Sequence, residues 1–300
     1  METAPTTDEV EAARAGAGAE AHPGALPNLI VIGAQKCGTS TLHYYLGLHP
    51  QVAMSETKEL NFFIAERNWP RGVAWYRRQF DPSAPVRGET SPNYTAHPVF
   101  QGVPERMHSV VPDARLIYLV RDPVDRIAAH WVHNVSKGRA EGDLAATLRT
   151  RATYVARSRY HMQLERFLAL FPRTSVLVVD QDELRHDREA TLARVFEFAG
   201  VDPAFRHPDF RQERHKTERK TVPTRLGARL ARRRERARRH LLSPAAWQAA
   251  SAYWPLGRRI PRPDVREALG PATLALLRED AERLRELTGK EFAGWSIWER

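Results

Sequence analysis

Three short apolar runs stand out along the chain, and a stretch with helical periodicity follows each of them. Short apolar runs rich in branched residues predict buried strands, and apolar residues that recur every three or four positions predict helices. We expect strands at NLIVIGA (28–34), RLIYLVRDP (115–123) and TSVLVVD (174–180), and helices at 39–50, 124–135 and 188–200. This alternation indicates an α/β fold with a central parallel sheet covered by helices on both faces.

The apolar pattern also suggests how the chain is organised. Residues 1–26 have no periodic pattern and are rich in Ala, Gly, Glu and Thr, which predicts a disordered tail. Residues 27–300 are expected to form a single domain. Within it, residues 224–262 read as a basic helical insertion or cover, and residues 271–300 as a C-terminal helix and tail with Gly289 at the helix end.

Composition narrows the class of protein. The chain is 42% hydrophobic and 27% charged, as globular proteins are, and no run reaches the roughly 18 apolar residues of a membrane helix. A single cysteine excludes an internal disulfide and the usual zinc spacings. We therefore expect a cytoplasmic protein without a metal. The net charge of +10 favours an anionic partner, namely a nucleotide, a polyanionic glycan, nucleic acid or acidic lipid.

The segment GAQKCGTST (33–41) has the features of a phosphate-binding loop. It leaves a predicted strand and enters a predicted helix, so free backbone amides and the positive end of the helix dipole point at one place. A glycine allows close approach, hydroxyls donate hydrogen bonds and a lysine adds charge. These residues are Lys36, Gly38, Thr39, Ser40 and Thr41. An ordinary strand–turn–helix with a solvated lysine is the alternative.

The loop differs from the one that binds a magnesium triphosphate. That motif places its lysine directly after the last glycine and before the hydroxyl residue that binds Mg²⁺. Here Lys36 precedes Gly38, and Arg121 stands before Asp122 where an acidic residue would close the second strand. We expect a P-loop-like fold, because a glycine-containing loop joins a strand to a helix. The position of Lys36 within this loop argues against a magnesium-bound triphosphate.

Two further residues are candidates for the site. Glu59 precedes Phe62 and Phe63, and a carboxylate beside apolar side chains can serve as a general base. The alternative is a solvated pair of Lys58 and Glu59 ahead of a core Phe-Phe. Arg121 closes the second predicted strand, so it is expected at the same sheet edge as Lys36, where it would suit a ligand with two separated phosphates. Its alternative is an ion pair with Asp122 or Asp125.

In this order these segments resemble the sulfotransferases that use 3′-phosphoadenosine-5′-phosphosulfate (PAPS), in particular the heparan-sulfate type and its bacterial relatives. IGAQKCGTSTL resembles the family's 5′-phosphosulfate loop, KELNFF its KE.HFF segment, GETSPNY its EK(T/S)P.Y segment and LIYLVRDPVDR its 3′-phosphate segment. FPRTSVLVVDQDEL and EDAERLRELTGKEFAGW also look like pieces of this family. The resemblance runs from about 29 to 226 and resumes near 271.

The resemblance implies a role for each matching residue. Lys36 would neutralise the leaving phosphate oxygen, and Glu59 would be the general base that deprotonates the acceptor. Arg121 would bind the 3′-phosphate. The loop residues Cys37, Gly38, Thr39, Ser40 and Thr41 would hold the 5′-phosphate, and Arg219 and Lys220, with Lys216 nearby, are candidates for a late loop that grips the cofactor. No metal is implied, and Cys37 is a loop residue, not a nucleophile.

This chain departs from the family pattern at two positions. Ala129 stands where a serine usually contacts the 3′-phosphate, so Arg121 lacks that helper unless His130, Trp131 or another basic residue replaces it. Thr90 stands where animal members often have lysine.

The sequence predicts transfer of a sulfuryl group to a hydroxyl or amine of a small-molecule or glycan acceptor. Rival hypotheses are an ATP-dependent kinase of similar fold and a polyanion- or nucleic-acid-binding protein that uses the Arg-rich helix. We expect no nucleic-acid partner and no transmembrane segment, and peripheral contact with an acidic surface is a further alternative. His43, Tyr44, Tyr94 and His97 are candidates for the acceptor side, with core packing as the alternative.

Overall fold

The computed structural model describes residues 24–137, 139–140, 143–211, 221–223, 257–260 and 263–299. Three sequence predictions fall largely or wholly outside these residues. They are the tail at 1–26, the basic segment at 224–262, and the candidate cofactor-gripping residues Lys216, Arg219 and Lys220.

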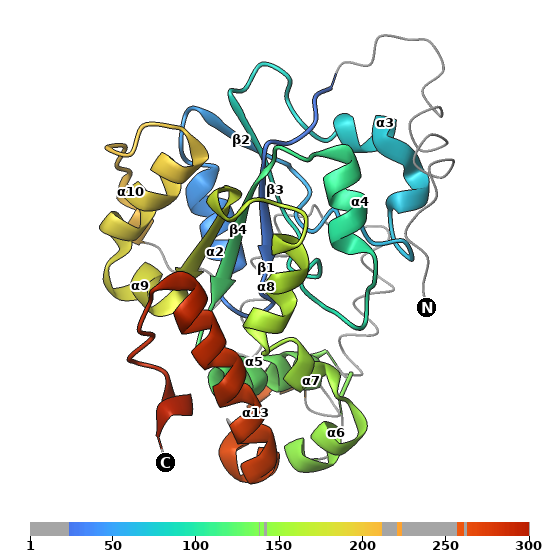
Figure 1. The fold of residues 1–300 in the computed structure, drawn as a ribbon, viewed down its shortest axis with the longest axis vertical. Helices are drawn as coiled ribbons and strands as arrows, with labels where there is room; N and C mark the ends of the chain where they lie inside the picture. Colours follow the sequence, from blue (N-terminus) through green and yellow to red (C-terminus); the bar gives the residue numbers. More distant parts are fainter. Residues whose placement is uncertain are drawn as a thin grey trace.

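A five-stranded parallel sheet forms the centre of the molecule (Figure 1), in the order β2-β3-β1-β4-β5. The strands are β1 (Leu29–Gly33), β2 (Val52–Met54), β3 (Val86–Thr90), β4 (Arg115–Val120) and β5 (Val176–Asp180). β1 is buried along its whole length because it is the middle strand and helices cover both of its faces. The predicted α/β fold and the three predicted strands are confirmed, whereas β2 and β3 were not predicted.

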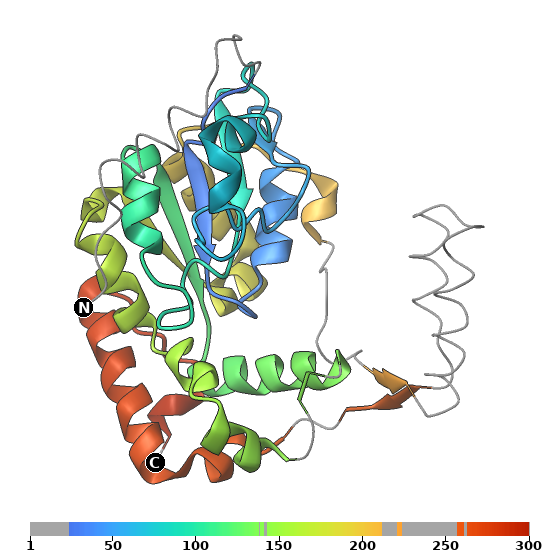
Figure 2. The ribbon, with the colours of Figure 1, turned by 90° about the vertical axis from the view of Figure 1, so that its right-hand side faces the viewer.

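Helices cover the sheet on both sides, as Figure 2 shows for α4 and α8 on one face and α2 on the other. Helix α10 lies on the face of α2, since Phe196 of α10 packs against His49, which follows α2, at a ring distance of 4.8 Å. The helices of these two layers are α2 (Thr39–Leu46), α4 (Val103–Val110), α8 (Tyr160–Leu168) and α10 (Arg188–Ala199). The remaining helices are α3 (Gly72–Arg77), α5 (Pro123–Ser136), α6 (Leu144–Thr150), α7 (Thr153–Ala156), α9 (Gln181–His186) and α13 (Val265–Thr288).

The carboxyl ends of the central strands bring three connections to one edge of the sheet. α2 follows β1 after a five-residue loop, α5 follows β4 after Arg121 and Asp122, and α9 follows β5 directly. In an open parallel sheet, ligands bind at this edge because the amino ends of helices and the loops between strands and helices meet there. Figure 2 shows α5 lying across this end of the sheet.

The ends of two predicted helices can be compared directly with the structure. The residue that caps α2 is Gly38, which has a left-handed backbone (φ 93°), and the hydroxyl residues Thr39 and Ser40 lie inside the helix. A residue without a Cβ adopts this conformation at little cost, whereas threonine and serine do not. The C-terminal helix ends at Gly289 as predicted, and it bends at Gly270 and Pro271.

Two smaller features complete the described part. Strands β6 (Thr221–Pro223) and β7 (Gly257–Arg259) form an antiparallel pair. Within the described residues, no helix is both long enough and apolar enough to cross a membrane.

Helix α13 is fixed to α8 through one buried carboxylate. Asp280, which is only 4% exposed, accepts hydrogen bonds from the backbone amides of His161 (2.9 Å) and Met162 (3.0 Å) in the first turn of α8. These amides have no partner within their own helix, so Asp280 serves as a cap supplied by a distant segment.

We expect Asp280→Ala to lower the free energy of unfolding by about 1–3 kcal/mol, because it leaves two amides near the start of α8 without an acceptor. Chemical denaturation followed by circular dichroism measures this change. Glu282→Ala, an exposed position on the same helix, is the control and should leave the midpoint unchanged. Equal midpoints for both variants would contradict the capping role.

Candidate active site

The loop between β1 and α2 turns sharply because two of its residues have positive φ. Lys36 has φ 77° and Gly38 has φ 93°, and the amide of Cys37 donates to the carbonyl of Ala34. At Gly33 an added Cβ would lie 2.0 Å from Thr95 Oγ1, so only glycine fits where the loop leaves the strand. A non-glycine residue such as Lys36 is held in this conformation only when the surrounding structure fixes it.

The amino end of α2 is open to an anion. No side chain caps the helix, and the carbonyl of Gly38 accepts from the amides of Thr41 and Leu42. The amides of Thr39 and Ser40, which come before these two, have no intrahelical acceptor and lie at the positive end of the helix dipole. Ser40 and Thr41 are half-buried beside them, whereas Thr39 is buried. This cradle fits a phosphate group, the 5′-phosphate of PAPS included.

Arg121 reaches this loop from the end of β4. One guanidinium nitrogen, Nη1, donates to the backbone carbonyl of Lys36 at 3.3 Å, and Nη2 pairs with Asp125 at 2.8 Å. The structure therefore brings Lys36 and Arg121 to the same sheet edge, and it also contains the Arg121–Asp125 pair considered as the alternative. The other candidate partner, Asp122, instead caps α5 by accepting from the amides of Val124 and Asp125.

Of the residues considered as replacements for the family serine at Ala129, Trp131 has a buried indole N–H without a hydrogen-bond partner among the described residues, whereas His130 is bonded to Arg126. Ala129 is buried on α5 and has no polar group. The next residue, His130, accepts from the Arg126 guanidinium through Nδ1 at 3.4 Å. Burial, together with the positive charges of Arg126, Arg157 and Lys36, holds the pKa of His130 far below its usual range, so its imidazole is neutral.

Glu59 does not lie in the apolar environment expected from its sequence neighbours. Its side chain is 46% exposed and forms a 3.1 Å ion pair with Lys58. Phe62 and Phe63 are fully buried and turn away into an aromatic cluster with Tyr76. This is the contact pattern of the alternative, a solvated Lys–Glu pair ahead of a core Phe-Phe. The left-handed backbone of Glu59 (φ 63°) explains why its side chain leaves the core that receives the two phenylalanines.

A buried carboxylate that was not assigned a role in the sequence organises the segment next to Glu59. Glu89, at the end of β3, is fully buried and accepts from three hydroxyl groups. The donors are Tyr76 (2.5 Å), Ser91 (2.7 Å) and Tyr94 (2.8 Å). Burial raises the pKa of Glu89, and the three hydrogen bonds oppose that rise.

Two of these hydroxyls extend the network to the backbone after Glu59. Ser91 Oγ accepts from the amide of Asn61 and Tyr94 Oη accepts from the amide of Phe62, both at 2.9 Å. The amide of Glu59 itself donates to the carbonyl of Thr90 at 2.9 Å. Glu89 thus fixes the segment that presents Glu59, and Tyr94 has a structural role instead of lining the acceptor side.

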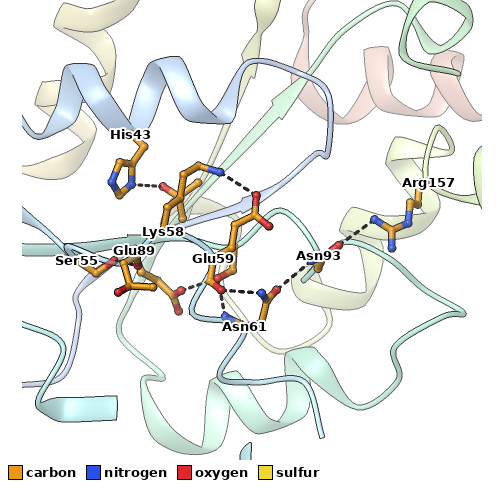
Figure 3. A network of polar contacts seen from close by, with 11 residues as sticks. His43, Ser55, Lys58, Glu59, Asn61, Glu89, Asn93 and Arg157 are labelled. Atoms are coloured by element: carbon orange, nitrogen blue, oxygen red, sulfur yellow. Dashed lines mark hydrogen bonds and ion pairs between the residues drawn. The ribbon is translucent and has the colours of Figure 1, made fainter. Parts of the chain in front are cut away.

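A second residue that sequence reasoning missed is Arg157, which directly follows α7 (Figure 3). Its Nη1 donates to Gln35 Oε1 in the phosphate loop (3.0 Å). The same Nη1 donates to Asn93 Oδ1 (3.1 Å), as Figure 3 shows. Asn93 in turn donates to the side chain of Asn61 (3.1 Å), which donates to the backbone carbonyl of Glu59 (2.7 Å). Arg157 therefore connects the phosphate loop with the segment that carries Glu59.

The remaining acceptor-side candidates lie in different places. His43 faces the site, where its Nδ1 is 3.0 Å from Thr90 Oγ1. Burial and the charge of Lys58 lower the pKa of His43 to about 4, so it is neutral at physiological pH. Tyr44 donates to Asp209 at 2.9 Å, and the backbone of His97 is bonded to Gln163.

These features define an anion-binding α/β enzyme site at the carboxyl edge of a parallel sheet, and comparison with known proteins gives its family. The sulfotransferase domain model matches residues 26–222, and the chain belongs to that family. Its relatives include enzymes of the heparan-sulfate type, so the resemblance inferred from its motifs is confirmed.

Curated relatives match over the same part of the chain. Human bifunctional heparan sulfate N-deacetylase/N-sulfotransferase 2 is 29% identical over 205 residues, which cover 59% of this chain and 22% of that protein. Mouse heparan sulfate glucosamine 3-O-sulfotransferase 5 is 30% identical over 193 residues, which cover 59% of this chain and 54% of that protein. The match thus spans between about a fifth and about half of the length of these relatives.

A solved structure extends the comparison to most of the chain. The crystal structure of a sulfotransferase from Alicyclobacillus acidocaldarius aligns with a TM-score of 0.64 and 25% sequence identity. The alignment covers 90% of this chain and 99% of that one.

Cys37 is expected to be unreactive in the folded protein. Its side chain is fully buried, Sγ lies 3.5 Å from Tyr160 Oη, and burial raises the pKa of the thiol to about 11. At pH 8 only about 0.1% of such a thiol is ionised, and the thiolate is the reactive form. Ellman's reagent should therefore modify Cys37 in guanidinium chloride but not in buffer. Complete modification of the folded protein over the same time would show that the loop opens.

Proposed function

We propose that the chain transfers a sulfuryl group from PAPS to a hydroxyl or amine of an acceptor by in-line displacement. The observation that supports this donor most directly is the contact of Arg121 with the backbone of Lys36. It places a guanidinium beside a loop suited to phosphate, so one ligand with two separated phosphates can engage both. PAPS carries a 3′-phosphate in addition to its 5′-phosphosulfate. Ordinary nucleoside triphosphates lack this 3′-phosphate.

Each donor-side residue has a distinct task in this proposal. The segment 37–41 holds the 5′-phosphate through the amides of Thr39 and Ser40 and the hydroxyls of Ser40 and Thr41. Lys36 neutralises the charge that develops on the leaving phosphate oxygen. Arg121 holds the 3′-phosphate, and its pair with Asp125 fixes the direction of its guanidinium. Arg219 and Lys220 are proposed to close over the cofactor; both lie outside the described residues.

Glu59 is proposed as the general base on the acceptor side. Its exposed carboxylate can reach an incoming acceptor, and the network centred on Glu89 fixes the backbone that carries it. The Lys58 ammonium lies 3.1 Å from the carboxylate and orients it. The acceptor loses its proton as its bond to sulfur forms, so a carboxylate of modest basicity suffices.

The acceptor is proposed to be a carbohydrate or a small natural product. The names of both relatives specify heparan sulfate, and that of the mouse enzyme also specifies glucosamine, which supports a hydroxyl or amine of a sugar. A cytoplasmic location is a prediction from the sequence and is part of this proposal.

Nucleotide binding tests the donor assignment. We expect wild-type protein to bind adenosine 3′,5′-bisphosphate without Mg²⁺ in isothermal titration calorimetry, and Arg121→Gln to weaken this binding by about tenfold or more through loss of a charge-assisted contact. Adenosine 5′-monophosphate, which lacks the 3′-phosphate, should bind both proteins equally. Arg115→Gln, at the opposite end of β4, is the control. Binding of magnesium ATP in preference to the bisphosphate would favour the kinase alternative.

The role of Glu59 can be separated from donor binding. Glu59→Gln should lower kcat by at least about 10²-fold, because the amide cannot accept the acceptor's proton, while the affinity for adenosine 3′,5′-bisphosphate stays the same. The assay combines radiolabelled PAPS with a panel of sugar and amine acceptors and identifies the product by mass. Glu56→Gln, an exposed position three residues earlier, is the control. Unchanged turnover in Glu59→Gln would remove this residue from the base role.

A further inference from the structure

Arg157 is a buried cation with an incomplete set of partners. It is 8% exposed, and within the described part of the chain its hydrogen bonds go to two neutral amide oxygens, those of Gln35 and Asn93. Its Nε–H is buried and has no hydrogen-bond partner among the described residues. Within those residues, Arg157 also forms no ion pair with a carboxylate. A guanidinium in this setting has lost its hydration without gaining an anion.

The guanidinium nevertheless carries its charge at neutral pH. Burial and the nearby charge of Arg126 lower the pKa of Arg157 to about 10, and the charge of Glu59 opposes that shift. A pKa of about 10 leaves the group protonated at pH 7. Burying an uncompensated charge is destabilising unless a bound anion offsets it. The structure around Arg157 is therefore suited to an anionic group that the ligand brings.

The position of Arg157 indicates which anionic group this is. On one side it holds Gln35, the residue before Lys36, and on the other it holds Asn93, which leads through Asn61 to the backbone of Glu59 (Figure 3). The charges of Arg157 and Lys36 are both close enough to lower the pKa of His130. Arg157 is thus tied to the element that would hold the leaving oxygen and to the element that would hold the base.

In an in-line transfer the leaving oxygen and the attacking atom lie on opposite sides of the sulfur. The three oxygens of the sulfuryl group that stay on the sulfur lie around it, between these two atoms. We propose that Arg157 contacts these three oxygens through its guanidinium and is a further catalytic residue. The bond between sulfur and the leaving phosphate oxygen breaks, and that oxygen keeps the electron pair beside Lys36. The new bond forms from sulfur to the acceptor oxygen or nitrogen, whose proton passes to Glu59. This inference rests on the proposed function.

The alternative is that Arg157 only holds the loop in shape. The two roles differ in their effect on ligands with and without the sulfuryl group. If Arg157 contacts this group, its substitution weakens the binding of PAPS. The binding of adenosine 3′,5′-bisphosphate, which lacks the group, stays the same. If Arg157 only shapes the loop, its substitution weakens the binding of both ligands and also lowers the melting temperature of the protein.

The experiment measures the affinities of Arg157→Gln and Arg157→Lys for PAPS and for adenosine 3′,5′-bisphosphate, and the rate at which each variant releases the bisphosphate from PAPS in water. Arg157→Gln should bind PAPS about tenfold or more weakly and bind the bisphosphate within about threefold of wild type. Its rate should fall by about 10²-fold or more, the scale expected for loss of one donor to a developing charge. Arg157→Lys should recover part of both losses.

Arg149→Gln, an exposed arginine on the neighbouring helix α6, is the matched control and should behave as wild type. Equal weakening of both ligands in Arg157→Gln, or wild-type affinity and rate with PAPS, would overturn the inference. If the wild-type protein itself binds neither ligand, the proposed function fails, and this inference fails with it. The first two outcomes leave the proposed function standing, so the failures can be told apart.

Discussion

The structure depends on a concentration of positive charge at the carboxyl edge of the sheet. Arg126 is fully buried, and its hydrogen bonds go to neutral acceptors, the hydroxyl of Ser158 and the carbonyl of Tyr154. Arg157 is nearly as buried and also has neutral partners, and Lys36 lies close by. Burial lowers the pKa values of Arg126, Arg157 and His130, and repulsion from the charge of Arg126 lowers those of Arg157 and His130 further. A multiply charged anion at this edge would relieve that repulsion, which is why a nucleotide with separate phosphates accounts for the arrangement better than a solvated surface does.

The acceptor side depends on a different principle, a single buried carboxylate surrounded by hydroxyl groups. Among the residues that the structure describes, no cation bonds to Glu89, and the hydroxyls of Tyr76, Ser91 and Tyr94 take the place of water. Because Ser91 and Tyr94 also accept from backbone amides after Glu59, the core fixes a residue that is itself exposed. The two sides meet through amide side chains, with Gln35 on the loop side and Asn93 and Asn61 on the other. Neutral amides can join a cationic and an anionic region without neutralising either of them.

Much of the fold followed from the sequence because β1, β4 and β5 are continuous apolar runs at the centre of the sheet. β2 and β3 were missed since VAM is very short and VRGET carries charged and small residues that only tertiary contacts bury. In the site, local motifs led to Lys36, Glu59 and Arg121. Arg157 could not be found in this way, because its partners Gln35 and Asn93 lie 122 and 64 positions away. The expected apolar surroundings of Glu59 were wrong, since a local backbone turn decides which way its side chain points and residue types alone do not encode that turn.

In the proposed complex one nucleotide bridges the loop of Lys36 and the guanidinium of Arg121. A crystal structure of the protein with adenosine 3′,5′-bisphosphate is the decisive test. We expect the 5′-phosphate at the amides that open α2 and the 3′-phosphate of the same molecule at Arg121. Electron density that places the nucleotide elsewhere, or that leaves either of these two positions without a phosphate, would contradict this expectation.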